Sequence, residues 1–468
     1  MKAVIGSRLE VFNLSRINEF FILGFITLFA VGLRFYKLGE WSFWYDEIFT
    51  LRDVQRISEL GLLDQQISRA LIYLTVHSLG ISEWSARLVP ALVGALTIPA
   101  LYFPLRRIFN PNVALLSGLL LAVSPWHLYW SQNARFYTTI LLFYTLALLV
   151  FYFGIEKDRP WYLFLFLFLV VLAVQERLFA LFLLPVAAGY LLLLKILPFD
   201  KPPGLRLRNV LILIIPVLAG GLIIGWKFIS ELSQWMIGFG WVNNNPAWIF
   251  SGVVYYVGLP IMVMGTLAGV YLIARKKRIA LLLVLSAVIP LVGIMTLSVV
   301  QYAANRYAFI SLTSWVILAA VAAWELLVNS TVNVRVLAIG ALLLLVVEPL
   351  SEDILYYRYQ NGNRDDWKSA LAFIDRVKDP MDKVVVTNTM LAEYYLKKPT
   401  IDINAINVEE LPNQGERVWF VEDMNLGDKT PKTLRWIKAN TTLMANFDVH
   451  VRARNFIMRI YLFDPNKQ

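Results

Sequence analysis

Long apolar runs alternate with short polar connections over the first 350 residues of the chain. A helix needs about 20 apolar residues to cross a hydrocarbon core of about 30 Å. Such runs occur near residues 19–36, 88–104, 112–126, 138–155, 161–175, 178–197, 210–228, 249–274, 279–299, 307–325 and 334–350. The pattern therefore predicts an α-helical polytopic membrane protein with about 11 transmembrane helices.

The stretch 161–197 is interrupted only by Gln175-Glu176-Arg177. We interpret it as two short helices that meet at one membrane face. A single long bent helix is the alternative.

The pattern changes after Leu350 to short apolar runs between polar segments. Residues 383–387, 417–421 and 455–462 have the composition of strands, and 366–377 and 432–440 that of helices. Strands that alternate with helices favour a small α/β domain. We therefore expect a transmembrane module over 1–350 and a C-terminal α/β domain over 351–468.

The net charge of +10 lies entirely in residues 1–350, because 351–468 holds 17 basic and 17 acidic residues. An excess of Lys and Arg in membrane-flanking loops marks the cytoplasmic side. The basic connections are Arg106-Arg107, Lys157 with Arg159, Lys195 to Arg208, Arg275 to Arg278, and Arg335. Placing them inside also places Lys2, Arg8 and Arg16 inside, so the N-terminus is expected to be cytoplasmic. Eleven spans then make the 351–468 domain extracytoplasmic and 36–87 a long external loop. The small size and modest architecture favour the plasma membrane as the location.

Composition excludes several classes of protein. Hydrophobic residues are 58% and charged residues 16% of the chain, whereas ordinary soluble domains carry about 25% charged residues. The chain is therefore too apolar for an ordinary soluble protein. The absence of Cys excludes disulfides, thiolate metal sites and a cysteine nucleophile. The sequence has no basic patch with interleaved aromatic residues, so a nucleic-acid partner is not expected. It also has no Gly-rich phosphate loop, so cytosolic nucleotide chemistry is not expected.

Two adjacent carboxylates, Asp46 and Glu47, follow an aromatic run in the predicted external loop. An interfacial belt that holds these acids at headgroup depth is formed by Trp41, Phe43, Trp44 and Tyr45. A base at that depth is well placed to act on a lipid-linked substrate. The alternatives are a solvated acid pair, or an Asp that caps the following helix.

Two further external clusters carry arginines. Residues 124–137 are rich in hydrogen-bond donors and contain Arg135, and residues 301–307 contain Arg306. Arg holds phosphate through bidentate hydrogen bonds, although an Arg at a membrane face is often only an anchor. His77 and His127 are too few and too scattered to predict a metal site.

Together these clusters resemble the membrane-embedded GT-C glycosyltransferases, specifically the group of protein O-mannosyltransferases and lipid A aminoarabinose transferases. The resemblance covers nearly the whole chain and lies in the order of the motifs. They are Trp44-Tyr45-Asp46-Glu47, Arg87-Leu88-Val89-Pro90-Ala91-Leu92-Val93-Gly94 with Arg106-Arg107 after it, Ser124-Pro125 to Tyr137, Arg306-Tyr307, and Arg364-Asp365-Asp366-Trp367.

The resemblance implies a GT-C fold and an inverting transfer of a sugar from a polyprenyl-phosphate donor to a lipid, glycan or protein acceptor. It implies that Asp46 is the catalytic base and that Glu47 orients the acceptor or the base. Arg135 and Arg306 would hold the donor phosphate, with hydrogen bonds from Tyr137 and Tyr307. Weaker candidates for the site are Arg87, His127 and Asn133.

The chain departs from the family pattern in three places. Asn133 stands where many relatives have an acid, 68–71 replaces a His-Pro-Pro-type stretch, and 175–177 replaces a His. Fewer acids and histidines weaken the case for a metal, so no cofactor is firmly predicted and Mg²⁺ or Mn²⁺ is left open.

Two other classes of function remain alternatives. A transporter or flippase of a lipid-linked sugar would have charges at the bilayer midplane and related halves, whereas here the charges lie at the membrane faces. A membrane-anchored receptor would leave Asp46 without a role.

Overall fold

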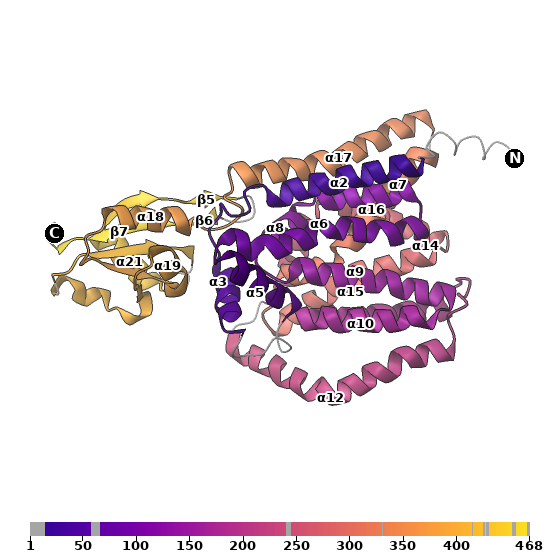
Figure 1. The fold of residues 1–468 in the computed structure, drawn as a ribbon, viewed down its shortest axis with the longest axis horizontal. Helices are drawn as coiled ribbons and strands as arrows, with labels where there is room; N and C mark the ends of the chain where they lie inside the picture. The colour runs from indigo at the N-terminus through magenta and orange to yellow at the C-terminus, as the bar shows by residue number, and fades with distance from the viewer. Residues whose placement is uncertain are drawn as a thin grey trace.

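The computed structural model describes residues 15–57, 66–239, 245–329, 331–413, 415–424, 426, 430–451 and 455–465. It shows a body of long helices with a smaller sheet-containing domain at one end (Figure 1). Lys2 and Arg8, which the orientation argument used, lie outside the described residues.

Within the described residues, the helical body contains α-helices between α2 and α17 and the 3₁₀ segments η3 and η4. Its elements are α2 Arg16–Phe35, α3 Tyr45–Gln55, α5 Ile67–Leu79, α6 Glu83–Ile108, α7 Pro111–Ala122, α8 Pro125–Ser131, α9 Tyr137–Lys157, α10 Pro160–Glu176, η3 Leu178–Phe182, α11 Leu183–Ile196, α12 Leu207–Phe239, α13 Pro246–Val257, α14 Leu259–Ala274, α15 Arg278–Val300, η4 Asn305–Ser311, α16 Leu312–Asn329 and α17 Val332–Arg358.

Local sequence fixes several of these helix starts. α7 and α8 each begin with Pro, whose missing N–H is no loss in the first turn. Asn110 caps α7 by accepting a hydrogen bond from the Val113 N–H, and Ser124 caps α8 through the His127 N–H. The short α8 therefore begins anew after α7 and places the following loop at the end of the helical body.

Each of the eleven apolar runs coincides with a helix or helix pair of the structure. Within the described ranges, seven helices are long and apolar enough to cross a membrane, or nine if the bent pairs α7–α8 (62°) and α13–α14 (97°) each form one span. Shorter apolar helices cover 160–176 and 207–222. The polytopic helical architecture is confirmed, and the count of 11 spans stays a prediction.

Large apolar side chains on the outer surface of the helical body indicate which environment surrounds it. On α2, Phe21, Phe25 and Leu28 are 74%, 71% and 71% exposed. Their spacing of four and three residues places them on one helix face. A face of this kind is satisfied by lipid, as expected for a multi-pass membrane protein.

The stretch 161–197 forms two helices, as predicted, and the single bent helix is wrong. α10 ends at Glu176, and Arg177 has the extended dihedral angles φ −165° and ψ 145°. The 3₁₀ segment η3 and then α11 follow. This break exposes Arg177 at the end of the body.

In its described residues, the C-terminal domain forms a five-stranded mixed sheet and a two-stranded ribbon. Its elements are α18 Trp367–Val377, β1 Lys383–Val386, α19 Thr389–Leu396, β2 Ile401–Asp402, η5 Ile403–Ala405, η6 Val408–Asn413, β3 Val418–Glu422, α21 Pro431–Asn440, β4 Thr442–Asn446, β5 Val449–His450, β6 Asn455–Phe456 and β7 Arg459–Phe463. The strand order is β2-β1-β3-β7-β4; β1 pairs in parallel with β2 and β3, and β7 pairs antiparallel with β3 and β4.

One strand prediction needs correction. Residues 455–462 form two strands instead of one, because β6 pairs with β5 in the ribbon while β7 joins the main sheet. The Phe447 N–H donates to the Met458 carbonyl at this break. The predicted helices over 366–377 and 432–440 are confirmed by α18 and α21.

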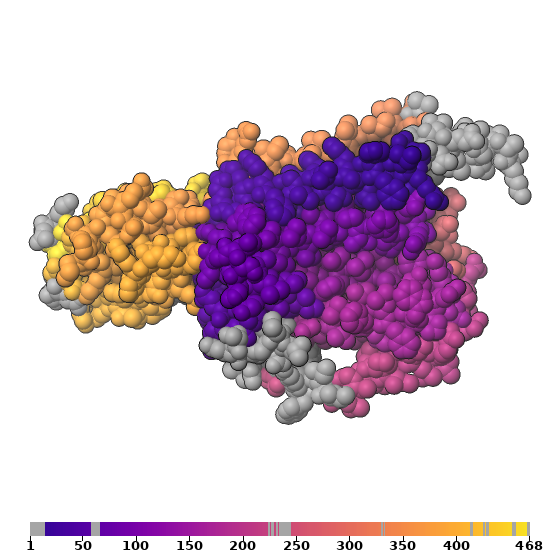
Figure 2. Space-filling view, viewed as in Figure 1, coloured from indigo at the N-terminus to yellow at the C-terminus, as the bar shows by residue number. Residues whose placement is uncertain are grey.

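The sheet domain packs on the end of the helical body through a shared apolar core. That core joins Phe43 and Ile48 of the first loop and α3 to Trp367, Leu391 and Met458 of the domain. Figure 2 shows the domain, in orange and yellow, projecting from the end of the body. α17 continues through residue 350 to Arg358 and so links the two parts.

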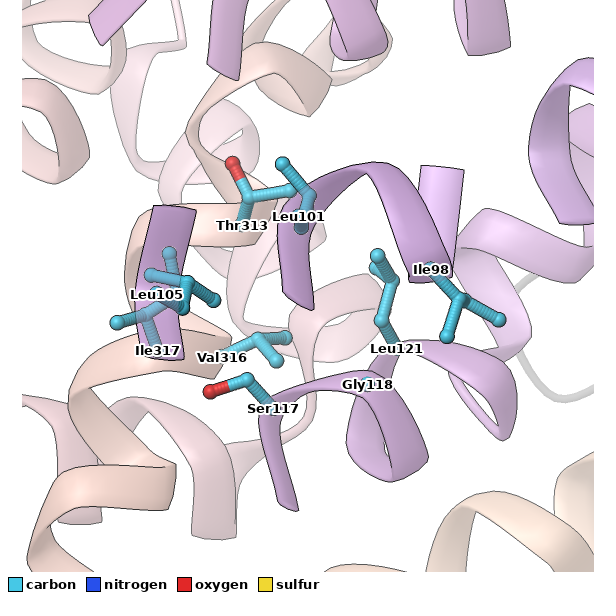
Figure 3. A pocket seen from close by; sticks show the side chains of 9 residues that line it. All are labelled: Ile98, Leu101, Leu105, Ser117, Gly118, Leu121, Thr313, Val316 and Ile317. Carbon is cyan, nitrogen blue, oxygen red and sulfur yellow. The ribbon is translucent and has the colours of Figure 1, made fainter. Parts of the chain in front are cut away.

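A small apolar pocket lies inside the body between α6, α7 and α16 (Figure 3). Its lining includes Ile98, Leu101, Leu121 and Val316. None of the predicted site residues lines this pocket, so it is separate from the candidate site.

Candidate active site

Asp46 lies in the first turn of α3 at the end of the body that faces the sheet domain. The helix begins at Tyr45 with Trp44 as its N-cap. The alternative in which Asp46 caps the helix is therefore wrong. The Asp46 side chain is 22% exposed, so its carboxylate is accessible from one side.

Arg135 and Arg306 approach Asp46 from two other parts of the chain. Arg135 comes from the loop between α8 and α9, and Arg306 from η4. Asp46 Oδ2 lies 3.8 Å from Arg135 Nη2 and 3.7 Å from Arg306 Nη2. The three clusters selected from the sequence therefore meet in one place.

Both guanidinium groups keep hydrogen-bonding capacity after these contacts. The Nε atoms of Arg135 and Arg306 are buried and have no hydrogen-bond partner within the described part of the chain. Their 3.7–3.8 Å contacts with Asp46 are longer than a direct hydrogen bond of about 2.7–3.2 Å. Buried donors of this kind favour an anionic ligand with several acceptor oxygens.

Arg135 is fixed by the helix that carries Asp46. Its Nη1 donates to the Asp46 carbonyl at 3.0 Å and to Thr50 Oγ1 at 2.9 Å. Burial lowers the pKa of the Arg135 guanidinium, Asp46 raises it, and the positive charges of Arg177 and Arg306 lower it further. Three like charges in one neighbourhood are balanced best by an anion.

Aromatic rings form one wall of this site. Tyr137 stacks on Trp130 with ring centroids 3.7 Å apart, and Tyr307 stacks on Phe179 at 5.6 Å. The Arg306 guanidinium lies 5.9 Å from the Trp44 ring. The Arg306 guanidinium also lies 5.7 Å from the Tyr307 ring, and Tyr137 lies close enough to Arg306 and Arg135 to interact electrostatically with both. The two predicted tyrosines therefore lie beside the arginines.

Glu47 lies in quite different surroundings, with no exposed surface. Its carboxylate accepts hydrogen bonds from Arg87 Nε and Nη2, both at 2.8 Å, from Arg364 Nη1 at 3.0 Å, and from the Ala134 N–H at 2.7 Å. The Glu47 carboxylate therefore does not face the solvent, where a ligand could bind. It connects four segments of the chain, which are α3, α6, the loop after α8 and the segment before α18.

Arg87, a weaker sequence candidate, belongs to this buried network. Besides Glu47, it donates to the carbonyls of Leu38, Trp41 and Ser42 at 3.2, 3.0 and 2.8 Å. It therefore holds the first loop closed against α6 and does not face Asp46.

The other two weaker candidates are also buried away from Asp46. His127 Nδ1 lies 2.6 Å from Arg34 Nη2. Asn133 Nδ2 donates to the Tyr129 carbonyl. The Asn133 carbonyl accepts a hydrogen bond from the Arg135 N–H at 2.7 Å, so this residue supports the loop that carries Arg135. Within the described residues, neither the His127 nor the Asn133 side chain pairs with the side chains of Asp46, Arg135 or Arg306.

Two of the sequence departures are in contact with each other. The buried Glu176 carboxylate accepts hydrogen bonds from the Ser68 N–H at 2.8 Å and from Ser68 Oγ at 2.6 Å. This contact joins the start of α5 to the break after α10. The neighbouring Arg177 acts electrostatically on Arg135, and the sequence did not predict it as a site residue. Its position directly after the Gln175-Glu176 pair that separates two spans could have indicated it.

The surroundings of Asp46 do not fit a divalent cation. The groups that pair with it are guanidinium cations, whereas Mg²⁺ and Mn²⁺ bind several oxygen ligands. In the part of the chain that the structure describes, no three His, Asp or Glu side chains gather as a metal site requires. The metal that the sequence left open has no evident ligand set here.

Comparison with known proteins identifies similar sequences. A family model for dolichyl-phosphate-mannose-protein mannosyltransferases matches residues 68–219. The dolichyl-phosphooligosaccharide-protein glycotransferase 2 of Pyrococcus furiosus is 30% identical over 257 residues, which are 52% of this chain. The chain spans only 32% of that relative's length.

Solved structures extend the similarity to almost the whole chain. ArnT from Cupriavidus metallidurans bound to undecaprenyl phosphate matches with a TM-score of 0.56 and 15% identity, over 94% of this chain and 98% of that chain. The Archaeoglobus fulgidus oligosaccharyltransferase tethered to an acceptor peptide matches with a TM-score of 0.60 and 11% identity, over 95% and 74%. The predicted resemblance to GT-C glycosyltransferases is confirmed, and the chain has their fold.

Proposed function

We propose that this protein is an inverting glycosyltransferase that moves a sugar from a polyprenyl-phosphate donor to a hydroxyl acceptor. The main support is that Asp46, Arg135 and Arg306 lie together. The Nε atoms of both arginines are buried and have no hydrogen-bond partner among the described residues. The solved ArnT structure holds undecaprenyl phosphate, and an archaeal oligosaccharyltransferase structure holds a dolichol phosphate. These relatives support a lipid-linked donor here.

The reaction is a single in-line displacement. The acceptor oxygen forms a bond to the anomeric carbon while the bond from that carbon to the donor phosphate oxygen breaks. Asp46 takes the proton of the acceptor hydroxyl, and polyprenyl phosphate leaves with its second negative charge. Attack from the face opposite the leaving group inverts the anomeric centre. A single carboxylate suffices, because no covalent sugar intermediate forms.

Arg135 and Arg306 bind the donor phosphate through the donors that remain free. They stabilise the transition state because the charge on the phosphate grows as the glycosidic bond breaks. In the structure both arginines also pair with Asp46. Binding of the phosphate transfers these pairings from the carboxylate to the donor, which leaves Asp46 facing the acceptor.

Tyr137 and Tyr307 add hydrogen bonds to the donor, and Glu47 acts indirectly by holding the backbone on which Asp46 stands. Arg87 serves the same buried network. The acceptor is a membrane lipid, a glycan or a protein of the cell envelope. The site lies at the external face of the plasma membrane, with the N-terminus in the cytoplasm and the C-terminal domain outside.

The test uses purified protein in nanodiscs with radiolabelled polyprenyl-phosphate sugars and a membrane extract as acceptor. Wild type is expected to transfer label to a new product, and Asp46→Asn to lose about 100-fold or more of this rate, as for removal of a general base. The product identifies the class of acceptor.

Asp53→Asn is the matched control, because Asp53 lies on the same helix and pairs with Arg52 and Arg69 instead of the site arginines. It is expected to keep the wild-type rate. If wild type and Asp46→Asn bind the donor equally and neither transfers sugar to any fraction, the transferase proposal fails. Movement of intact donor across the bilayer would then favour the flippase alternative.

A further inference from the structure

The buried network around Glu47 includes a residue from the C-terminal region. Arg364 follows α17 and precedes α18, and it is 1% exposed. Its Nη1 donates to Glu47 Oε2 at 3.0 Å, and the Glu47 side chain is itself fully buried. A guanidinium placed this deep needs a specific set of acceptors.

Arg364 has acceptors on three segments. Besides Glu47, Nη1 lies 3.4 Å from the Ser42 carbonyl, Nη2 lies 3.4 Å from the Gln132 carbonyl, and Nε donates to the Gly362 carbonyl at 3.1 Å. Ser42 belongs to the loop before α3, and Gln132 begins the loop that carries Arg135. One side chain therefore connects the segments that present the base and the phosphate-binding arginine.

The chain reaches this position through an unusual turn. Asn361, Gly362 and Asn363 all have positive φ, at 46°, 63° and 56°. A Cβ on Gly362 would lie 2.6 Å from a ring atom of Trp41, so only glycine fits against that ring. The turn locks Arg364 against the first loop independently of its ion pair.

The buried network and the exposed site are adjacent layers of the same backbone. Glu47 follows Asp46 in sequence, and the Glu47 carboxylate accepts from the Ala134 N–H, one residue before Arg135. A shift of Glu47 must therefore move both Asp46 and Arg135. Misplacement by about 1 Å costs on the order of 100-fold in rate.

We propose that Arg364 is a positioning residue for the glycosyl transfer, through which the C-terminal domain sets the geometry of Asp46 and Arg135. This inference rests on the proposed function, and it gives the C-terminal domain a part in the chemical step. Arg364 does not touch the substrate.

The test compares Arg364→Met with wild type in nanodiscs. Removal of Arg364 leaves Glu47 and Arg87 as a balanced buried pair, so the variant is expected to fold. We expect kcat to fall about 100-fold while KM for the donor stays near the wild-type value, because the phosphate-binding arginines remain. Arg364→Lys keeps the positive charge but loses the planar, forked set of guanidinium donors. Its kcat should therefore lie between those of wild type and Arg364→Met.

Lys368→Ala is the matched control. Lys368 also connects the domain to the first loop, through the carbonyls of Gly39 and Glu40, but it does not reach Glu47. It should leave kcat unchanged. Hydrogen exchange supplies a second readout: amides of 42–50 and 132–137 should exchange faster in Arg364→Met, while those in the middle of α9 stay protected.

A folded Arg364→Met variant with wild-type kcat and unchanged exchange in these two segments would overturn the inference and leave the transferase proposal standing. If wild-type protein transfers no sugar, the transferase proposal fails instead. The exchange measurement then still decides whether Arg364 orders the two segments, and unchanged exchange would overturn the positioning role on its own.

Discussion

Successive residues on an α-helix point about 100° apart, and this angle separates the surroundings of Asp46 and Glu47. Asp46 faces Arg135 and Arg306 and is partly exposed. Glu47 faces Arg87 and Arg364 and is fully buried. The sequence identified the pair, but it could not assign the two roles, because the partners of Glu47 lie 40 and 317 residues away.

Glu47→Gln should destabilise the fold by about 3–5 kcal/mol, because it leaves two buried guanidinium groups without their common partner. Glu40→Gln is the control, since Glu40 forms an exposed pair with Lys37 and should cost at most about 1 kcal/mol. Thermal unfolding in detergent measures both. Equal unfolding temperatures for the two variants would contradict the structural role of Glu47.

The same network predicts a pH dependence of stability. Burial alone would raise the pKa of Glu47, but Arg87, Arg364 and the Ala134 N–H outweigh burial and lower it. Glu47 therefore stabilises the fold at every pH above its unfolded-state pKa of about 4.3, and this contribution is lost as the pH falls through the lower folded-state pKa. The stability gap between wild type and Glu47→Gln should stay constant from about pH 8 to pH 5 and shrink in stronger acid. A gap that shrinks between pH 7 and pH 5 would show that the pKa is not lowered.

At the scale of elements, the helices that cross or line the apolar body were predictable, and the short ones at its end were not. Apolar length identified runs such as 138–155 and 279–299, which became α9 and α15. By contrast, α3 packs against α19 of the sheet domain, and α5 packs against α3 and α6. Contacts of this kind leave no long apolar run in the sequence. The split at 457–458 was missed for a related reason: strand propensity does not reveal which partner strand each half will meet.

Close packing between α6 and α8 gives an element-scale prediction. A Cβ on Gly94 of α6 would lie 2.9 Å from the Ser131 Cβ at the end of α8, four residues before Arg135. Gly94→Ala should therefore destabilise the fold by about 1–3 kcal/mol through overpacking and lower transferase activity. The control is Gly24→Ala on α2, where a Cβ meets nothing within 4 Å and the better helix propensity of Ala should stabilise by about 0.5–1 kcal/mol. Similar unfolding temperatures for both variants would mean that α6 and α8 do not pack this closely.

On the scale of the whole molecule, opposite charges gather at the end of the body away from the sheet domain. Glu19 at the start of α2 pairs with Arg106 at the end of α6 at 2.9 Å, and Glu156 at the end of α9 pairs with Arg278 at the start of α15 at 2.5 Å. Arg34, near the other end of α2, contacts His127 in α8. Since α2 has 20 residues and rises about 1.5 Å per residue, about 30 Å separates the basic connections from the site. This spacing matches the thickness of a hydrocarbon core.

The positive-inside rule assigns the basic end to the cytoplasm, and the absence of Cys makes this assignment directly testable. Lys277 is exposed in the basic turn before α15, and Met381 is 91% exposed in the sheet domain. In intact cells, a membrane-impermeant maleimide should label Met381→Cys and should reach Lys277→Cys only after permeabilisation. The cysteine-free parent provides the background, and labelling of both variants after permeabilisation shows that each thiol is accessible. Labelling in the reverse order would place Asp46 on the cytoplasmic face, since Asp46 and the sheet domain lie at the same end of the body. The proposed lipid-linked donor would then have to be used from the cytoplasmic side.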